Sequence, residues 1–118
     1  MKVYISGKIG RNEKIAKATL EKFAKREKRL RDIGCETFNP TTSGLGTLAE
    51  NYARANGSTF YQEILLLDLM ELSKCDAIYL LPDWKDSPGA MVEFMFANAI
   101  GLTVFEETVR GVKQWHKK

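Results

Sequence analysis

Glu93 is the residue of this sequence whose surroundings most clearly suggest chemistry. Apolar side chains recur at helical spacing over residues 90–100, and a glutamate on that apolar face needs a reason. Ser87 fits an N-cap and Pro88 fits the first helical position, so Glu93 is expected a little over one turn inside a helix. It is either a partly exposed helix glutamate or a carboxylate aimed into a cleft, beside backbone amides of Ser87 and Gly89 that can hold an anion.

Two further segments carry groups that could serve a site. Asp68 stands inside I-L-L-L-D-L-M-E-L, a helical stretch that is apolar nearly all round. This acid either points along the less buried side or is held at a site, and we favour a site. Residues 7–11, G-K-I-G-R, combine two glycines with two cations and could bring N–H groups and a cation against a phosphate. They match neither the dinucleotide-binding fingerprint nor the P-loop, and an ordinary turn would look the same.

The composition argues against several classes of protein. The net charge is +3, and many cations lie in residues 14–31, where interleaved glutamates supply acid–base partners four residues apart. We interpret that segment as the solvated face of a helix and expect no nucleic acid partner. Cys35 and Cys75 have no Cys or His spaced for metal binding, so we expect reduced thiols and no metal. No apolar run is long enough to span a membrane and the chain starts directly with a strand, so we expect a cytoplasmic protein.

The elements that position these groups can be predicted from the periodicity of apolar residues and from the turn residues between them. Short apolar runs closed by turn residues predict strands, and apolar residues three and four apart predict helices. We expect strands at 2–6, 35–38, 77–81 and 102–105, helices at about 12–33, 59–73 and 88–100, and a short helix from 106 onward. Residues 41–57, with a small helical patch around 48–52, are expected to form a long loop. We take this loop as a lid or substrate-side insertion, with surface decoration as the alternative.

This order of elements predicts an α/β fold with one domain over residues 1–118. We expect a three-layer Rossmann-like or flavodoxin-like sandwich around a parallel sheet of four to five strands, in the order 2-1-3-4. Ligands of such sheets bind at the carboxyl ends of the strands, where the strand order reverses. Tyr4, Ser6, Gly7, residues 83–87 and Glu93 would gather there.

Several motifs resemble a known superfamily. They are K-V-Y-I-S-G-K-I at the start, N-P after the second strand, L-x-x-C-D-A-I-Y-L-L-P before the turn, and S-P-G-A-M-V-E after it. Together they resemble the nucleoside 2-deoxyribosyltransferase-like superfamily, and more closely a small DUF4406-like branch of it. The resemblance covers most of the chain and is weakest over 41–57.

The resemblance implies roles for three residues. Glu93 matches the nucleophilic glutamate that attacks the anomeric carbon of a 2-deoxyribosyl unit, giving a covalent glycosyl-enzyme. Tyr4 matches the aromatic hydroxyl that helps orient this glutamate. Asp68 matches the acid on the preceding helix, placed to contact the sugar or base and to handle the proton of the leaving base.

The resemblance also implies a set of substrate-binding residues. The transferases usually have aspartate at the offset of Ser87, whereas related 2-deoxynucleoside 5-monophosphate N-glycosidases have a serine that helps bind phosphate. A serine at a helix N-terminus favours nucleotide monophosphates, while Asp86 keeps the transferase alternative open if the turn is shifted by one residue. Trp84 is either a base-stacking wall or a core residue. The remaining candidates are Ser6, Gly7, Lys8, Arg11 and Gly89.

The function expected from these residues is N-glycosidic bond cleavage or base transfer on a 2-deoxynucleoside or its 5-monophosphate, without metal or organic cofactor. The alternative is a non-catalytic module that binds or senses a nucleotide in the same cleft. The surroundings of Glu93 distinguish the two, because a nucleophile should be oriented by Tyr4 and open to the cleft, whereas a sensor could bury it in a salt bridge. By analogy with the superfamily we expect a homodimer or larger homo-oligomer, with Met91, Met95 and Phe96 as a plausible interface.

Overall fold

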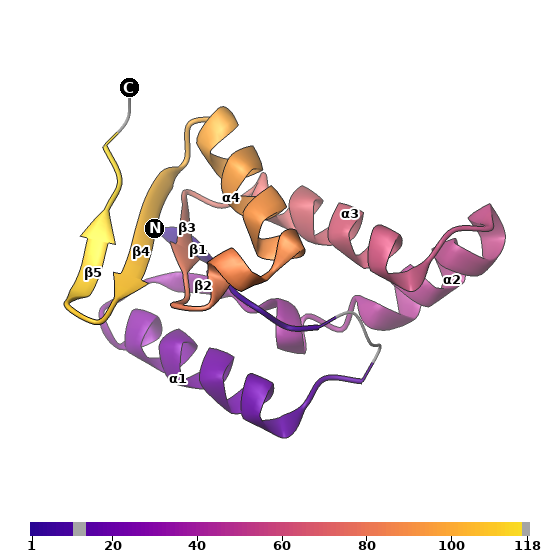
Figure 1. Cartoon of the computed structure of the whole chain (residues 1–118), viewed down its shortest axis with the longest axis horizontal. Coiled ribbons are helices and arrows are strands. Elements are labelled where there is room, and N and C mark those ends of the chain that lie inside the picture. Colours follow the sequence, from indigo (N-terminus) through magenta and orange to yellow (C-terminus); the bar gives the residue numbers. More distant parts are fainter. Residues whose placement is uncertain (11–13, 117–118) are drawn as a thin grey trace.

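Five strands form one sheet that lies between α1 and α4 (Figure 1). The computed structural model describes residues 1–10 and 14–116. The strands are β1 (Lys2–Ser6), β2 (Glu36–Phe38), β3 (Ala77–Leu80), β4 (Thr103–Thr108) and β5 (Gly111–Gln114). Their order is β2-β1-β3-β4-β5, and every pairing is parallel except that of β4 with β5. The expected α/β class and the strand order 2-1-3-4 are therefore confirmed, with an antiparallel strand added at one edge.

Side-chain alternation makes the two central strands buried on both faces. On β1, Val3 and Ile5 face one side of the sheet while Tyr4 and Ser6 face the other, and all four are almost fully buried. On β3, alternate residues divide between the same two core clusters. A strand buried on both faces reads as a continuous apolar run, which is why the run at 77–80 could be recognised.

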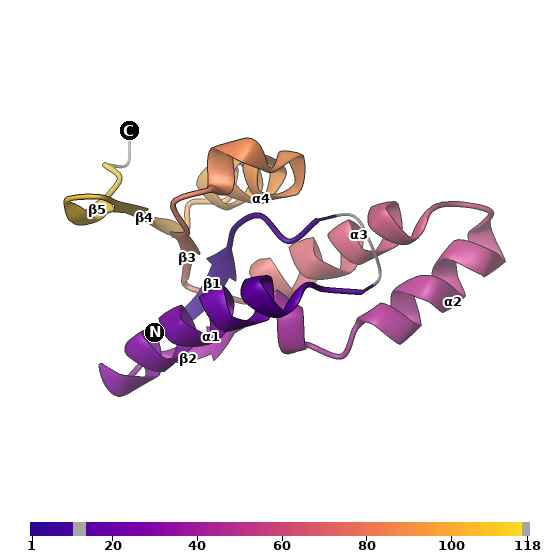
Figure 2. The same ribbon diagram turned by 60° about the horizontal axis from the view of Figure 1, so that its bottom comes forward.

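Helices cover both faces of this sheet, which makes the fold a three-layer sandwich (Figure 2). α1 (Lys17–Asp32) packs on one face through Phe23 and Leu30. α4 (Pro88–Ala99) covers the other face, together with the end of α3 (Phe60–Leu72). Right-handed crossovers require this arrangement, because β1 leads to β2 on one side and β2 leads back past β1 to β3 on the other.

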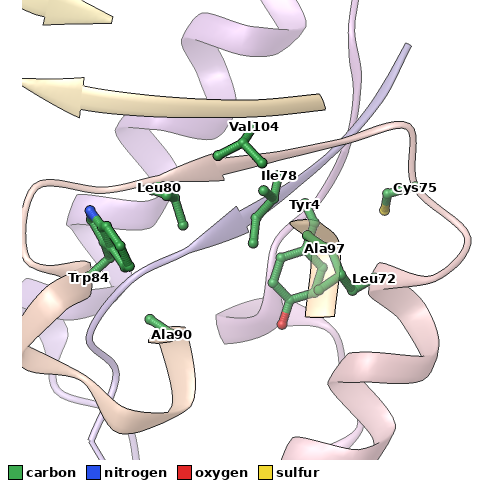
Figure 3. Close-up of a cluster of buried hydrophobic side chains, with 9 residues drawn as sticks. All are labelled: Tyr4, Leu72, Cys75, Ile78, Leu80, Trp84, Ala90, Ala97 and Val104. Atoms are coloured by element: carbon green, nitrogen blue, oxygen red, sulfur yellow. The ribbon is translucent and has the colours of Figure 1, made fainter. Parts of the chain in front are cut away.

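The core on the α4 side is built around Tyr4 (Figure 3). The Tyr4 ring stacks on Phe38 at 5.2 Å, and its hydroxyl points away from Ile78 and Val104. Trp84 lies at one end of this cluster, where it is 5% exposed and packs against Phe94. Of the two roles considered for Trp84, the structure shows the core residue, and its indole N–H donates to Glu106.

Two expected elements differ from the structure. Residues 41–57 do not form a long loop, because a short 3-10 helix, Pro40–Thr42, is followed by α2 (Gly46–Asn56). α2 buries only Ala49 and pairs with α3 as a hairpin that projects from the sheet (Figure 1). The expected helix from residue 106 is also wrong: β4 continues to Thr108 and turns into β5. The β-formers at 102–109 and the glycine at 111, whose φ is +118°, favour that hairpin.

The helix expected from about residue 12 begins at Lys17. Residues 11–13 lie outside the described part of the chain. Within the described residues, no helix combines the length and apolar character needed to cross a lipid bilayer.

Candidate active site

Glu93 faces the sheet from the second turn of α4. Ser87 caps this helix by accepting the Ala90 N–H at its Oγ, and Pro88 occupies the first position, as the sequence predicted. The buried side of α4 consists of Ala90, Glu93 and Ala97, so the small alanines let the helix approach the sheet with the carboxylate between them. Glu93 is 6% exposed.

Two hydroxyls from β1 hold the carboxylate of Glu93. The Tyr4 hydroxyl donates to Oε2 at 2.5 Å, and the Ser6 hydroxyl donates to Oε1 at 2.7 Å. Tyr4 and Ser6 are two residues apart on one strand, so alternation places both on the α4 face. Ion pairs found among the described residues do not include Glu93. The carboxylate is therefore oriented by neutral donors and is not neutralised by a salt bridge.

A cavity of about 470 Å³ opens beside Glu93 at the carboxyl ends of β1 and β3. The loop after β1, the segment before α2, the first three turns of α3 and the first two turns of α4 form its walls. Its lining combines polar and charged side chains with apolar ones. Such a cavity, at the switch point of a doubly covered sheet, has the size and position typical of a small-molecule site.

Asp68 shares this cavity with Glu93. It lies on the buried side of α3 and is 6% exposed, and its Oδ1 accepts no hydrogen bond from the described residues. Burial, and then the charges of Glu93 and Glu71, raises the pKa of Asp68 to about 8. A buried acid with this pKa is protonated at neutral pH and can donate a proton into the cavity.

The pKa of Glu93 is raised less than that of Asp68. Burial raises the pKa of Glu93 to about 7. The rise is limited because the hydrogen bonds from Tyr4 and Ser6 stabilise the ionised form. Burial, followed by the charge of Glu93, raises the pKa of Tyr4 well above its ordinary value. Tyr4 therefore remains a hydrogen-bond donor while Glu93 titrates.

The N-terminus of α4 offers donors at the wall of the cavity. Ser87 and Gly89 line it, and Ser87 is buried. A Cβ on Gly89 would lie 2.8 Å from the Tyr61 hydroxyl, so glycine allows the aromatic side chain to lie against the start of the helix. Lys8 lines the same cavity from the loop after β1 and is its only lining cation among the described residues.

The structure gathers most of the residues selected from sequence. Those lining the cavity are Gly7, Lys8, Asp68, Asp86, Ser87, Gly89 and Glu93. Tyr4 and Ser6 lie behind them and contact the cavity through Glu93. Trp84 does not line the cavity. Arg11 lies outside the described residues.

Sequence reasoning missed the opposite wall of the cavity. Phe60 and Tyr61 line it from the first turn of α3, and Thr41 and Ser43 line it from the segment before α2. The pair of aromatic residues directly after the capping Thr59 was a usable signal for the first group. The second could not be placed, because the path of residues 40–46 depends on the packing of α2 against α3.

Comparison with known families gives one match. The model of DUF4406, a domain of unknown function, matches residues 1–106, which is most of the chain and includes every element from β1 to α4. No curated protein matches the sequence. Groups of three or more His, Cys, Asp and Glu residues that could hold a metal ion do not occur in the described part of the chain.

Proposed function

This chain belongs to the DUF4406 family, whose function is unknown. We propose that it breaks the N-glycosidic bond of a 2-deoxynucleoside or of its 5-monophosphate. One observation carries the proposal. Glu93 is a buried carboxylate at a cavity wall, held by the Tyr4 and Ser6 hydroxyls and paired with no cation of the described residues. Burial of an unneutralised carboxylate is costly, and such sites are typical of catalytic groups.

The two carboxyl groups divide the chemistry between them. An ionised Glu93 oxygen attacks the anomeric carbon, and the bond from that carbon to the base nitrogen breaks with its electron pair on the base. Protonated Asp68 gives its proton to the departing base. The glycosyl ester is then resolved by water or a second base, whose proton returns to Asp68 as the Glu93 carboxylate is released. Tyr4 and Ser6 fix the orientation of the attacking oxygen throughout.

We further propose that the cavity wall formed by the start of α4 and by Lys8 binds a 5-phosphate. Ser87 Oγ already accepts the Ala90 N–H, which leaves its hydroxyl hydrogen available to a phosphate oxygen. Backbone amides at the start of α4 and the Lys8 ammonium supply favourable charge. The negative charge of Asp86 opposes phosphate binding. The balance between Asp86 and these favourable groups therefore sets the preference between nucleosides and monophosphates.

These roles are those implied by the resemblance to the nucleoside 2-deoxyribosyltransferase-like superfamily, and we propose that DUF4406 proteins such as this one share its covalent mechanism. The geometry supports this independently of the motif, because orientation by Tyr4 and openness to the cavity are what separate a nucleophile from a sensor's buried ion pair.

We also propose that the protein forms a homo-oligomer through α3 and α4. Their exposed positions carry no charged side chain and include Leu66, Met70, Met91, Val92 and Met95. Phe96, which was expected on this surface, is half buried and packs against the core. A helix pair that is apolar on its outer side is normally covered.

The test is chromatography of free base released from a panel of 2-deoxynucleosides and their 5-monophosphates, with and without an acceptor base. We expect release by the wild type and none by Glu93→Gln, which keeps the size of the side chain but cannot form the ester. Glu21→Gln, at an exposed position of α1 outside the cavity, is the matched control and should retain turnover. If no base is released from any substrate of the panel, or if Glu93→Gln is as active as the wild type, the proposal is contradicted and a nucleotide-binding module is favoured.

A further inference from the structure

Asp83 and Lys22 connect the two loops that meet at the switch point, although neither lines the cavity. The Lys8 N–H donates to Asp83 Oδ1 at 3.1 Å. The Lys22 ammonium donates to Asp83 Oδ2 at 2.5 Å and to the Lys8 carbonyl oxygen at 2.9 Å. Both polar backbone groups of Lys8 are therefore bound within one closed ring, which we call the Lys8 clamp (Lys8, Lys22 and Asp83).

The residues before Lys8 are held against the same segment. The Leu81 N–H donates to the Ser6 carbonyl oxygen at 2.8 Å. A Cβ on Gly7 would lie 2.8 Å from Leu81 Cδ1 and 3.1 Å from Asp83 Oδ1, so only glycine fits this close approach. Residues 6–8, which lead from β1 to the wall of the cavity, are thus held in place by the segment after β3.

The clamp is better suited to positioning than to stabilising the fold. The side chains of Lys22 and Asp83 are 29% and 31% exposed, and ion pairs at such exposure contribute little to stability because water screens them. Their bonds to the Lys8 backbone, in contrast, determine the path of the Gly7–Lys8 wall. The clamp also draws residues from α1, the loop after β1 and the turn after β3, so it links three separate elements.

We propose that Asp83 and Lys22 are positioning residues that preorganise the Gly7–Lys8 backbone for substrate binding. That the substrate is a 2-deoxynucleoside or its 5-monophosphate rests on the proposed function. A preordered wall removes the cost of ordering the loop on binding, so loss of the clamp should weaken affinity. The bond-breaking groups, Glu93 and Asp68, stand on other elements and should be little affected.

Three variants separate this role from a general effect of charge. Asp83→Ala removes the acceptor of the Lys8 N–H. The exchange Lys22→Asp with Asp83→Lys restores opposite charges, but a lysine at 83 cannot accept from the Lys8 N–H and an aspartate at 22 cannot donate to the Lys8 carbonyl. Asp32→Ala is the matched control, because it removes an aspartate that pairs with Lys28 on the exposed surface of α1.

The first readout is hydrogen exchange of the Lys8 amide, measured by NMR, which does not depend on any activity. We expect exchange about tenfold faster or more in Asp83→Ala and in the charge exchange, and no change in Asp32→Ala. Unchanged protection of the Lys8 amide in Asp83→Ala would overturn the clamp.

The second readout is calorimetric binding of 2-deoxyadenosine 5-monophosphate, with each variant placed in the Glu93→Gln protein. We expect about tenfold weaker binding for Asp83→Ala and for the charge exchange, and in the Glu93 enzyme a KM raised about tenfold with kcat changed less than about threefold. Recovery of affinity in the charge exchange, or unaltered affinity in Asp83→Ala, would overturn the positioning role alone. Absence of binding of every 2-deoxynucleoside and 5-monophosphate of the panel to the Glu93→Gln parent would instead overturn the proposed function, and the positioning role with it.

Discussion

Glu93 and Asp68 differ in the hydrogen bonds they receive and in the charges beside them, and both differences separate their pKa values. Glu93 accepts two hydroxyl hydrogen bonds, while Asp68 Oδ1 accepts none from the described residues. Their pKa values, about 7 and about 8, therefore favour an ionised Glu93 beside a protonated Asp68 near neutral pH. Those are the states that a nucleophile and a proton donor need.

At the scale of these residues, the proposed mechanism predicts a bell-shaped pH profile. Turnover should rise as Glu93 ionises near pH 7 and fall as Asp68 loses its proton near pH 8, so the optimum lies between them. Asp68→Asn should remove the alkaline limb and lower kcat about 100-fold or more for natural bases. Initial rates of base release from pH 5 to pH 9 would measure this. An alkaline limb that persists in Asp68→Asn would contradict the assignment.

Stability should respond to the same two groups whether or not the protein is an enzyme. A carboxyl group whose folded pKa is raised contributes stability that is fully present below its unfolded pKa, near 4, and is lost as pH rises through the folded value. For Glu93 the shift from 4.5 to about 7 corresponds to about 3 kcal/mol lost between pH 4 and pH 8. Glu93→Gln has no charged form, so its free energy of unfolding should fall by about 3 kcal/mol less over that range.

Urea unfolding at a series of pH values measures this difference. The control is Glu21→Gln, at an exposed position of α1, which should follow the wild-type curve. Parallel curves for the wild type and Glu93→Gln would show that the Glu93 carboxylate is not destabilised by burial.

At the level of elements, Ser87 at the start of α4 has two roles. It caps the helix, and in the proposed function it also binds phosphate. Aspartate caps a helix about as well as serine, but its charge repels a phosphate. Ser87→Asp should therefore keep stability within about 0.5 kcal/mol while reducing the preference for monophosphates over nucleosides about tenfold or more. Ser87→Ala should lose about 1 kcal/mol of stability through the missing cap.

Thermal unfolding and the ratio of kcat/KM for the two substrate classes measure the two effects. The matched control is Thr59→Ala, which removes the N-cap of α3 that accepts the Gln62 N–H. It should lower stability as Ser87→Ala does without changing the substrate ratio. An unchanged ratio in Ser87→Asp would exclude Ser87 as a phosphate ligand.

The elements that were predictable are those whose signals are local. Thr59 and Ser87 cap their helices, and Pro82 follows β3, because caps and prolines act within a few residues. Only the middle of α2, the patch around 48–52, was predicted as helical, because the helix is polar and buries only Ala49, so its full length depends on contact with α3. β5 escaped prediction because all of its residues are exposed and only its pairing with β4 defines it as a strand. In the site, the face of β1 was predictable, whereas the wall from residues 40–46 was not.

At the scale of the whole molecule, the two helical layers have opposite surfaces. Most exposed positions of α1 are charged, namely Lys17, Glu21, Lys25, Lys28, Arg29, Arg31 and Asp32. The exposed positions of α3 and α4 carry no charge, and these two helices lie in contact (Figure 1). Since like surfaces meet in a two-fold interface, an uncharged face can pack against its own copy without electrostatic repulsion. The asymmetry therefore favours self-association through α3 and α4.

A single charge on that face should prevent self-association. Met95 is 64% exposed on α4, and Met95→Glu would bury a carboxylate without a partner in the interface. We expect a dimer or larger oligomer for the wild type and a monomer for Met95→Glu by analytical ultracentrifugation. Ile33→Glu, at a 77% exposed apolar residue on the α1 side, is the matched control and should keep the wild-type mass. A monomeric wild type, or dissociation by Ile33→Glu alone, would show that α3 and α4 are not the interface.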